Sequence, residues 1–170
     1  MRNVKEYLTD HEIVKQLLKE AHLINLDCHG CDKLDLGRRS GMRMDTFTRA
    51  LDSLGYEVLV SEVGADSEIP VISGGEAYDY GEILRRIMFR DKLTQTWLAQ
   101  RCGYSSVQGV RQILYANKRA MRVPTFVNLL RPMQQNLYVR SKNNPDEVYQ
   151  VRSQVPTPLE KDVMRYEANL

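Results

Sequence analysis

Apolar and polar residues alternate at helical spacing between residues 93 and 133, and this spacing predicts three short amphipathic helices. The first covers residues 95–102, the second covers residues 107–114, and the third has Pro124 in its first turn. The expected capping residues are Thr94 before the first helix, Gly103 after it, and Ser105 or Ser106 before the second. The residues expected to face a core are Trp97, Leu98, Cys102, Val110, Leu114, Phe126, Leu129 and Leu130, with Ala99 small enough for a close helix crossing.

Two further amphipathic helices are predicted upstream. Residues 12–24 form one, with Thr9 or Asp10 as its cap, and residues 80–91 form the other. The inward residues are Ile13, Leu17, Leu18 and Ala21 in the earlier helix and Ile83, Leu84, Ile87 and Met88 in the later one, whose outward residues are Arg85, Arg86 and Arg90.

An internal repeat relates the two halves of the chain with an offset of 79 residues (122 − 43 = 79). The residues ArgMetAspThrPhe at 43–47 lie over ArgValProThrPhe at 122–126, and each copy continues from a helix into an alternating apolar segment. The alternating segments flank turns rich in Gly, Asn, Pro and Asp, which is typical of a β-hairpin. The predicted strands are residues 55–60 and 69–72 in the first copy, and 137–140 and 148–151 in the second.

The first copy is altered upstream of this match. Gly30 aligns with Gly109, so residues 28–36 occupy the position of the second short helix, yet they carry Asp32 and Asp35 against Lys33 alone. An acidic surface there would repel a polyanion. Three arginines that follow could still touch phosphate or belong to a solvated loop: Arg38, Arg39 and Arg43.

These patterns predict a mainly α fold with short β-hairpins. We expect two tandem small helical domains, each ending in a β-hairpin, of which the second carries a helix-turn-helix. The predicted units are a degenerate acidic domain (1–72), a linker (73–79), the helix-turn-helix domain (80–152) and a C-terminal tail (153–170) that could form a docking helix or fray.

Individual residues between positions 93 and 130 support the prediction of a helix-turn-helix. Two short helices meet at a glycine, and the second is polar and basic on its outer side. The stretch LTQTWLAQRCGYSS, followed by VRQIL and NKRAMRVPTFVNLL, resembles the helix-turn-helix of the Cro/phage-repressor (Xre) family. It is closest to a small group in Gram-positive bacteria and their mobile elements, in which a GYxS turn precedes the recognition helix. The match covers residues 80–151, and Val107, Gly109 and Pro124 depart from the pattern.

The charge of the chain divides at the same boundary. Residues 1–79 hold 9 Lys+Arg and 15 Asp+Glu, a balance of −6, whereas residues 80–170 hold 15 and 7, a balance of +8. A basic half suits a polyanion, and an acidic half does not. The division indicates two domains with different roles.

The candidate DNA-binding residues lie on and around the second short helix. Polar side chains near the start of a helix in the major groove can pair with bases, and Arg and Gln suit guanine and adenine. By the resemblance, Gln95 would bind phosphate together with nearby backbone N–H groups, and the residues after the second helix would hold the flanking backbone. Tyr115 could stack on the sugar-phosphate or pack on the hairpin. The full set is Thr94, Gln95, Ser105, Ser106, Gln108, Arg111, Gln112, Tyr115, Asn117, Lys118 and Arg119.

The cysteines predict neither a disulfide framework nor an evident metal site. Cys102 occupies a core position and is expected to be a small buried hydrophobe. Cys28 and Cys31 form an isolated CxxC with His11, His22 and His29 in the same region, where a structural role is favoured and a metal or redox role stays open. No catalytic motif is recognisable, so we expect no enzymatic activity, no cofactor and no catalytic residue. No membrane span or signal peptide is recognisable, which predicts a cytoplasmic protein.

The sequence therefore predicts a sequence-specific DNA-binding transcriptional regulator, such as a repressor, of a bacterial or phage mobile element. Double-stranded DNA is the expected partner. Because helix-turn-helix proteins bind paired half-sites about 34 Å apart, a homodimer is expected. The alternative is a protein-binding inhibitor of a host defence nuclease, of the anti-CRISPR kind, in which the acidic N-terminal half would bind the protein partner.

Overall fold

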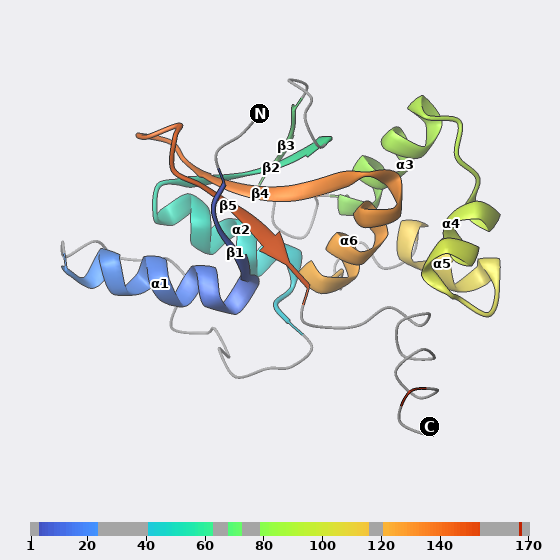
Figure 1. The fold of residues 1–170 in the computed structure, drawn as a ribbon, viewed down its shortest axis with the longest axis horizontal. Coiled ribbons are helices and arrows are strands. Elements are labelled where there is room, and N and C mark those ends of the chain that lie inside the picture. Colours follow the sequence, from blue (N-terminus) through green and yellow to red (C-terminus); the bar gives the residue numbers. More distant parts are fainter. Residues whose placement is uncertain are drawn as a thin grey trace.

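The computed structural model describes residues 4–23, 41–62, 68–72, 79–115, 121–153 and 167. Within these ranges the chain forms six α-helices, a short 3-10 helix and a five-stranded sheet (Figure 1). The helices are α1 (Asp10–Leu23), α2 (Met44–Ser53), α3 (Tyr80–Arg90), α4 (Gln95–Cys102), α5 (Val107–Tyr115) and α6 (Val123–Leu130), followed by η3 (Arg131–Met133). The strands are β1 (Val4–Thr9), β2 (Tyr56–Glu62), β3 (Glu68–Val71), β4 (Gln135–Ser141) and β5 (Val148–Arg152).

The prediction of a mainly α fold made of two tandem helical domains with separate hairpins is wrong. The two hairpins do form, because β2 pairs with β3 and β4 pairs with β5. However, β2 also pairs with β4 over its whole length, and β1 adds to β5 in parallel. The result is one mixed sheet with strand order β1-β5-β4-β2-β3. Strand β1 has no counterpart in the sequence-based prediction.

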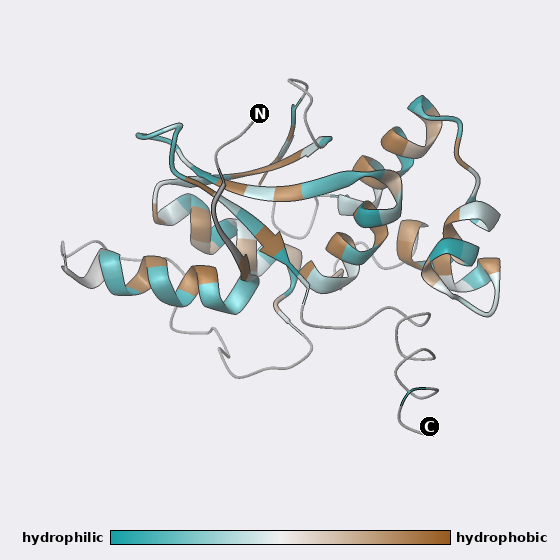
Figure 2. Ribbon diagram, viewed as in Figure 1, coloured by the Kyte–Doolittle hydropathy of each residue, from teal (hydrophilic) through white to brown (hydrophobic). Residues whose placement is uncertain are grey.

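One face of this sheet packs against helices from both halves of the chain. Contacts join α1 to β5, α2 to β2, and α6 to β4 and β5. Hydrophobic and hydrophilic bands alternate along α1 in Figure 2, as expected of a helix with one side in a core. The strand residues in the same core cluster are Val58, Val60, Val71, Leu137, Val139, Tyr149 and Val151. Residues from both halves of the chain therefore belong to one core beneath one sheet.

The 79-residue repeat appears in the sheet as a local two-fold symmetry. Leu59 pairs with Tyr138, its own repeat equivalent (138 − 59 = 79), at the middle of the β2–β4 ladder. The two neighbouring pairs are equivalent under the same offset. Adding 79 to Val58 gives Leu137, and subtracting 79 from Val139 gives Val60, so the pair Val58–Val139 maps onto the pair Val60–Leu137. In the first copy (residues 10–72) and the second copy (residues 80–152), the matched strands β2 and β4 are therefore related by a pseudo-two-fold axis that crosses the sheet between them.

A second contact obeys the same symmetry. Arg43 and Arg122, which are repeat equivalents, form an isolated antiparallel bridge. The Met44 N–H donates to the Met121 carbonyl at 2.8 Å, and the Val123 N–H donates to the Met42 carbonyl at 2.8 Å. Because these two hydrogen bonds map onto each other under the offset, the copies meet symmetrically at the start of α2 and α6 as well as in the sheet. Arg43, a candidate phosphate ligand in the sequence, instead pairs with Asp45 at 2.9 Å.

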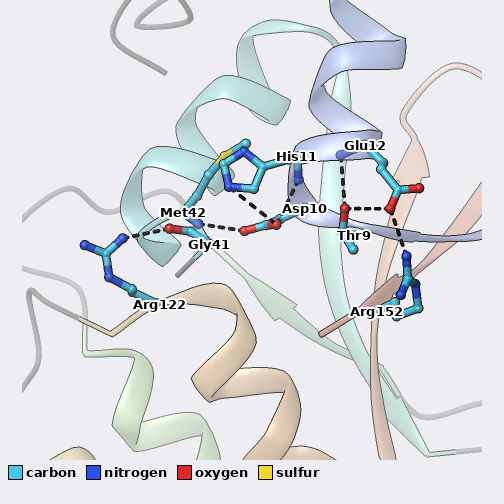
Figure 3. A network of polar contacts seen from close by, with 8 residues as sticks. All are labelled: Thr9, Asp10, His11, Glu12, Gly41, Met42, Arg122 and Arg152. Carbon is cyan, nitrogen blue, oxygen red and sulfur yellow. Dashed lines mark hydrogen bonds and ion pairs between the residues drawn. The ribbon is translucent and has the colours of Figure 1, made fainter. Parts of the chain in front are cut away.

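Gly41 lies at this junction in a conformation that glycine favours, with φ of 80°. Arg122 Nη1 donates to its carbonyl at 2.7 Å, and the next amide, that of Met42, donates to Asp10 Oδ2 at 2.7 Å (Figure 3). A Cβ at Gly41 would overlap the ring of Pro124 in the second copy. The close approach of the two copies here requires a residue without a side chain.

A capping network joins the start of α1 to the second copy. Thr9 Oγ1 accepts from the Glu12 N–H at 3.2 Å and donates to Glu12 Oε1 at 2.9 Å, so Thr9 is the cap (Figure 3). The same Glu12 oxygen accepts from Arg152 at 2.9 Å. Arg152 belongs to β5, so the network reaches across the two copies.

Other ion pairs link the acidic first copy to the basic second copy. They join Asp52 to Lys142 at 2.5 Å, Glu57 to Arg140 at 2.7 Å, and Glu68 to Arg140 at 3.1 Å. Exposed pairs of this kind contribute about 0–1 kcal/mol each. Their significance is that carboxylates of the first copy are engaged within the protein, so part of the charge division is compensated inside the fold.

No helix among the described residues is long and apolar enough to cross a membrane. The predicted linker (73–79) lies outside the described residues except for Asp79, and so do residues 24–40, with Cys28 and Cys31, and nearly all of the C-terminal tail.

Candidate nucleic-acid interface

Helix α4 forms where its local sequence signals predict it. Thr94 Oγ1 accepts from the Trp97 N–H at 3.0 Å, which confirms Thr94 as the N-cap. Gly103 ends the helix in the left-handed conformation with φ of 77°. Leu98, Ala99 and Cys102 are buried, as predicted for its inner side, whereas Trp97, also predicted to face inward, is only partly buried. The turn that follows directs the chain into α5.

Helix α5 has one buried and one exposed side. Val110 and Leu114 are fully buried and fix the helix against the core. Gln108, Arg111 and Gln112 are exposed and, with Tyr115, follow the i, i+3, i+4, i+7 spacing of a single helix face. Ser105 and Ser106, at the turn before the helix, are exposed too. The structure therefore brings these predicted site residues onto one accessible surface.

The start of α4 meets this surface through one side-chain contact. Arg111 Nε donates to Gln95 Oε1 at 3.3 Å, a distance at the long end for such a bond. The two residues lie 16 positions apart in the chain. Gln95 therefore lies beside the exposed face of α5, next to a helix N-terminus whose first N–H groups have no partner within the helix.

Gly109 allows close packing between α5 and the turn that precedes it. A Cβ at Gly109 would lie 3.3 Å from Cδ1 of the Tyr104 ring, which is a tight contact. Tyr104 belongs to the turn, packs against the core, and has its pKa raised above the ordinary value by burial. Glycine at position 109 thus lets the turn residue pack closely on α5.

Arg85 was predicted to face outward, and this prediction is wrong. Its guanidinium donates to the Leu114 carbonyl near the end of α5 and pairs with Asp79 at 2.8 Å. It also lies over the Tyr115 ring, 4.7 Å from the centroid. A cation is favoured at the C-terminal end of a helix. Arg85 therefore holds α3 to the end of α5, and Tyr115 is engaged by Arg85 while half of its surface stays exposed.

Gly81 makes the same helix contact possible through close packing. A Cβ at this position would overlap the Leu114 carbonyl, which is backbone and cannot rotate away. We expect Gly81→Ala to lower the free energy of unfolding by about 1–3 kcal/mol, because it overpacks the α3–α5 contact. Thermal unfolding of the two proteins measures this. Gly109→Ala, whose neighbour is a side chain, should cost less, and equal losses would contradict this account of the contact.

Exposed cations lie on α3 and on or next to α4. Arg86 and Lys92 are exposed, and Arg101 lies over the Trp97 ring at 5.5 Å. Residues 80–132 hold 10 Lys+Arg and 2 Asp+Glu. Asn117, Lys118 and Arg119, the predicted backbone clamp, lie outside the described residues.

One exposed aromatic residue was not predicted. Phe89 on α3 is 89% exposed, although it is large and apolar. With Arg86, Arg90 and Ile69 it lines an open pocket of about 680 Å³. The signal is present in the sequence, since Phe89 lies two positions after the buried Ile87 and so points away from the core.

Among the described residues, no group of three or more His, Cys, Asp or Glu side chains is placed to hold a metal ion. Cys102 is confirmed as buried, and its Sγ lies 3.8 Å from the Asn128 carbonyl of α6. Comparisons with family models, with curated proteins and with solved structures give no match.

Proposed function

We propose that the protein binds double-stranded DNA through α4 and α5 and acts as a sequence-specific transcriptional regulator of a bacterial or phage element. The observation that carries the proposal is the exposed face of α5. It presents Gln108, Arg111 and Gln112, while the opposite side of the helix is fixed in the core. Recognition of the major groove by a helix uses this arrangement, because the side chains that contact bases must project from a helix held firmly in place.

The surroundings of α5 supply contacts to the DNA backbone. Gln95 and the first N–H groups of α4 can donate to a phosphate beside the groove. Arg101 on α4 and Lys92, two residues before the cap Thr94, add positive charge beside it. Phosphate contacts position a protein on the duplex, and base contacts specify the sequence. The surface contains residues suited to both.

The alternative role as a protein-binding inhibitor has weaker support. It requires acidic groups of the N-terminal half to be available to a protein partner. Glu12, Asp52 and Glu57 are instead paired with cations of the second copy. Inhibition of a host nuclease by a protein that has no affinity for duplex DNA would favour this alternative.

We expect the full chain to bind a mixed-sequence duplex with strong salt dependence. Each neutralised phosphate contributes about 0.9 to the slope of log K against log salt concentration. Lys118→Ala should reduce that slope by about one unit and weaken binding to all sequences alike. Salt titrations followed by fluorescence anisotropy measure both effects.

Lys142→Ala is the matched control for this titration. Lys142 pairs with Asp52 and lies at the β4–β5 turn, far from α4 and α5 in Figure 1. Its removal should leave the slope unchanged. Absence of duplex binding at low salt, or an equal change in slope for both variants, would contradict the proposed function.

A further inference from the structure

Dimeric helix-turn-helix proteins bind DNA with two-fold symmetry. In this protein a pseudo-two-fold symmetry relates two copies within a single chain. Dimeric members of this class place two equal recognition helices about a two-fold axis that coincides with the axis of a palindromic site. In this protein the axis relates the first and second copies through the β2–β4 ladder and the Arg43–Arg122 bridge. The surfaces that symmetric copies would use to associate are thus already buried within the monomer.

The two copies differ in length in the segment that follows the first helix of each copy. The buried residues of α1 match those of α3 with an offset of 70, as in Ile13 with Ile83 and Leu17 with Ile87 (87 − 17 = 70). The later helices and strands match with an offset of 79. The first copy is therefore nine residues shorter between its first helix and the segments that match with the offset of 79 (79 − 70 = 9).

The composition of that shorter segment differs too. Where the second copy carries Gln108, Arg111 and Gln112, residues 28–36 of the first copy carry Asp32 and Asp35. Carboxylates oppose binding to phosphate-lined grooves. The shorter length and the acidic residues both indicate that the first copy packs against the second as a dimer partner would, but does not itself contact bases.

We propose that one chain binds one asymmetric, non-palindromic duplex site, with α5 as its single reading helix. This inference rests on the proposed function and replaces the expected homodimer. The first copy supports the second through the shared sheet and core. At one of the two edges of the sheet, β3 carries the exposed Pro70, which lacks an N–H and does not favour pairing with another chain.

The test starts from duplexes selected by the full-length protein from a random library. The enriched motif should be non-palindromic, and mass photometry of the complex on a long duplex carrying one motif should show the mass of one 19.7 kDa chain added to the DNA. A palindromic motif bound by two chains would overturn the inference while leaving the proposed function intact. Absence of any enrichment would overturn both.

A second measurement uses duplexes with one motif or with two inverted motifs spaced by one helical turn. The per-site dissociation constants should agree within about twofold, because no second chain is needed to complete the site. Binding more than about tenfold tighter on the inverted pair would show cooperative dimerisation and contradict the single-chain mode. Arg111→Ala should weaken binding to both duplexes by the same factor.

Discussion

Replacement of Arg111 by alanine is expected to weaken binding to the preferred duplex by about 1–3 kcal/mol, the cost of losing a bidentate base contact, and to change binding to random duplex little. The expectation follows from the position of Arg111 on the exposed face of α5, with its guanidinium beside Gln95. Equilibrium titrations of both proteins on both duplexes measure the difference. Equal losses on the two duplexes would mean that Arg111 contacts the backbone and does not read bases.

Arg49→Ala is the matched control for that titration. Arg49 is an exposed arginine on the helix α2, which lies on the far side of the molecule from α5 in Figure 1. The substitution removes the same charge from a helix surface. If it weakened binding to the preferred duplex as much as Arg111→Ala, net charge would explain the loss and α5 would have no special role.

Gly41→Ala is expected to lower the free energy of unfolding by more than the cost of the positive φ angle at this position. The left-handed conformation costs a residue with a side chain about 1–2 kcal/mol. The overlap of the new Cβ with the Pro124 ring adds about 1–3 kcal/mol, because it forces the two copies apart at their junction. At about 2–4 °C per kcal/mol, the unfolding midpoint should fall by several degrees or more.

Gly55→Ala separates the two causes. Gly55 has a similar φ of 86°, but a Cβ there would meet no atom within 4 Å. It should therefore show the conformational cost without the overlap. Equal changes in the unfolding midpoint for Gly41→Ala and Gly55→Ala would contradict the close junction between the copies.

The helices around the site were predictable because their determinants lie within a few residues of each other. The Thr94 hydroxyl reaches an amide three positions later, and Gly103 ends the same helix through its own backbone angle. Val110 and Leu114 define the buried side of α5 by spacing alone. Such local signals also placed Gln108, Arg111 and Gln112 on the outer side.

The sheet could not be predicted in the same way, because an alternating strand does not specify its partner. Either hairpin satisfies its own turn signals whether or not it joins the other. The sequence does contain a hint, since Val58, Leu59 and Val60 form a continuous apolar run that suits a strand buried on both faces better than an edge of a separate hairpin. Arg85 was misplaced for a similar reason, because its partner carbonyl lies 29 residues away.

Amide chemical shifts test residue by residue whether the face formed by α4 and α5 binds duplex DNA. In ¹H–¹⁵N spectra of the full chain titrated with a selected duplex, we expect the largest changes at Gln95, Ser106 and Gln108 through Gln112, with small changes along α1 and α2. The indole of Trp97, the one tryptophan of the chain, should shift as well because it belongs to α4. Large changes confined to α1 or to the strands, with α4 and α5 unaffected, would contradict DNA binding by this face.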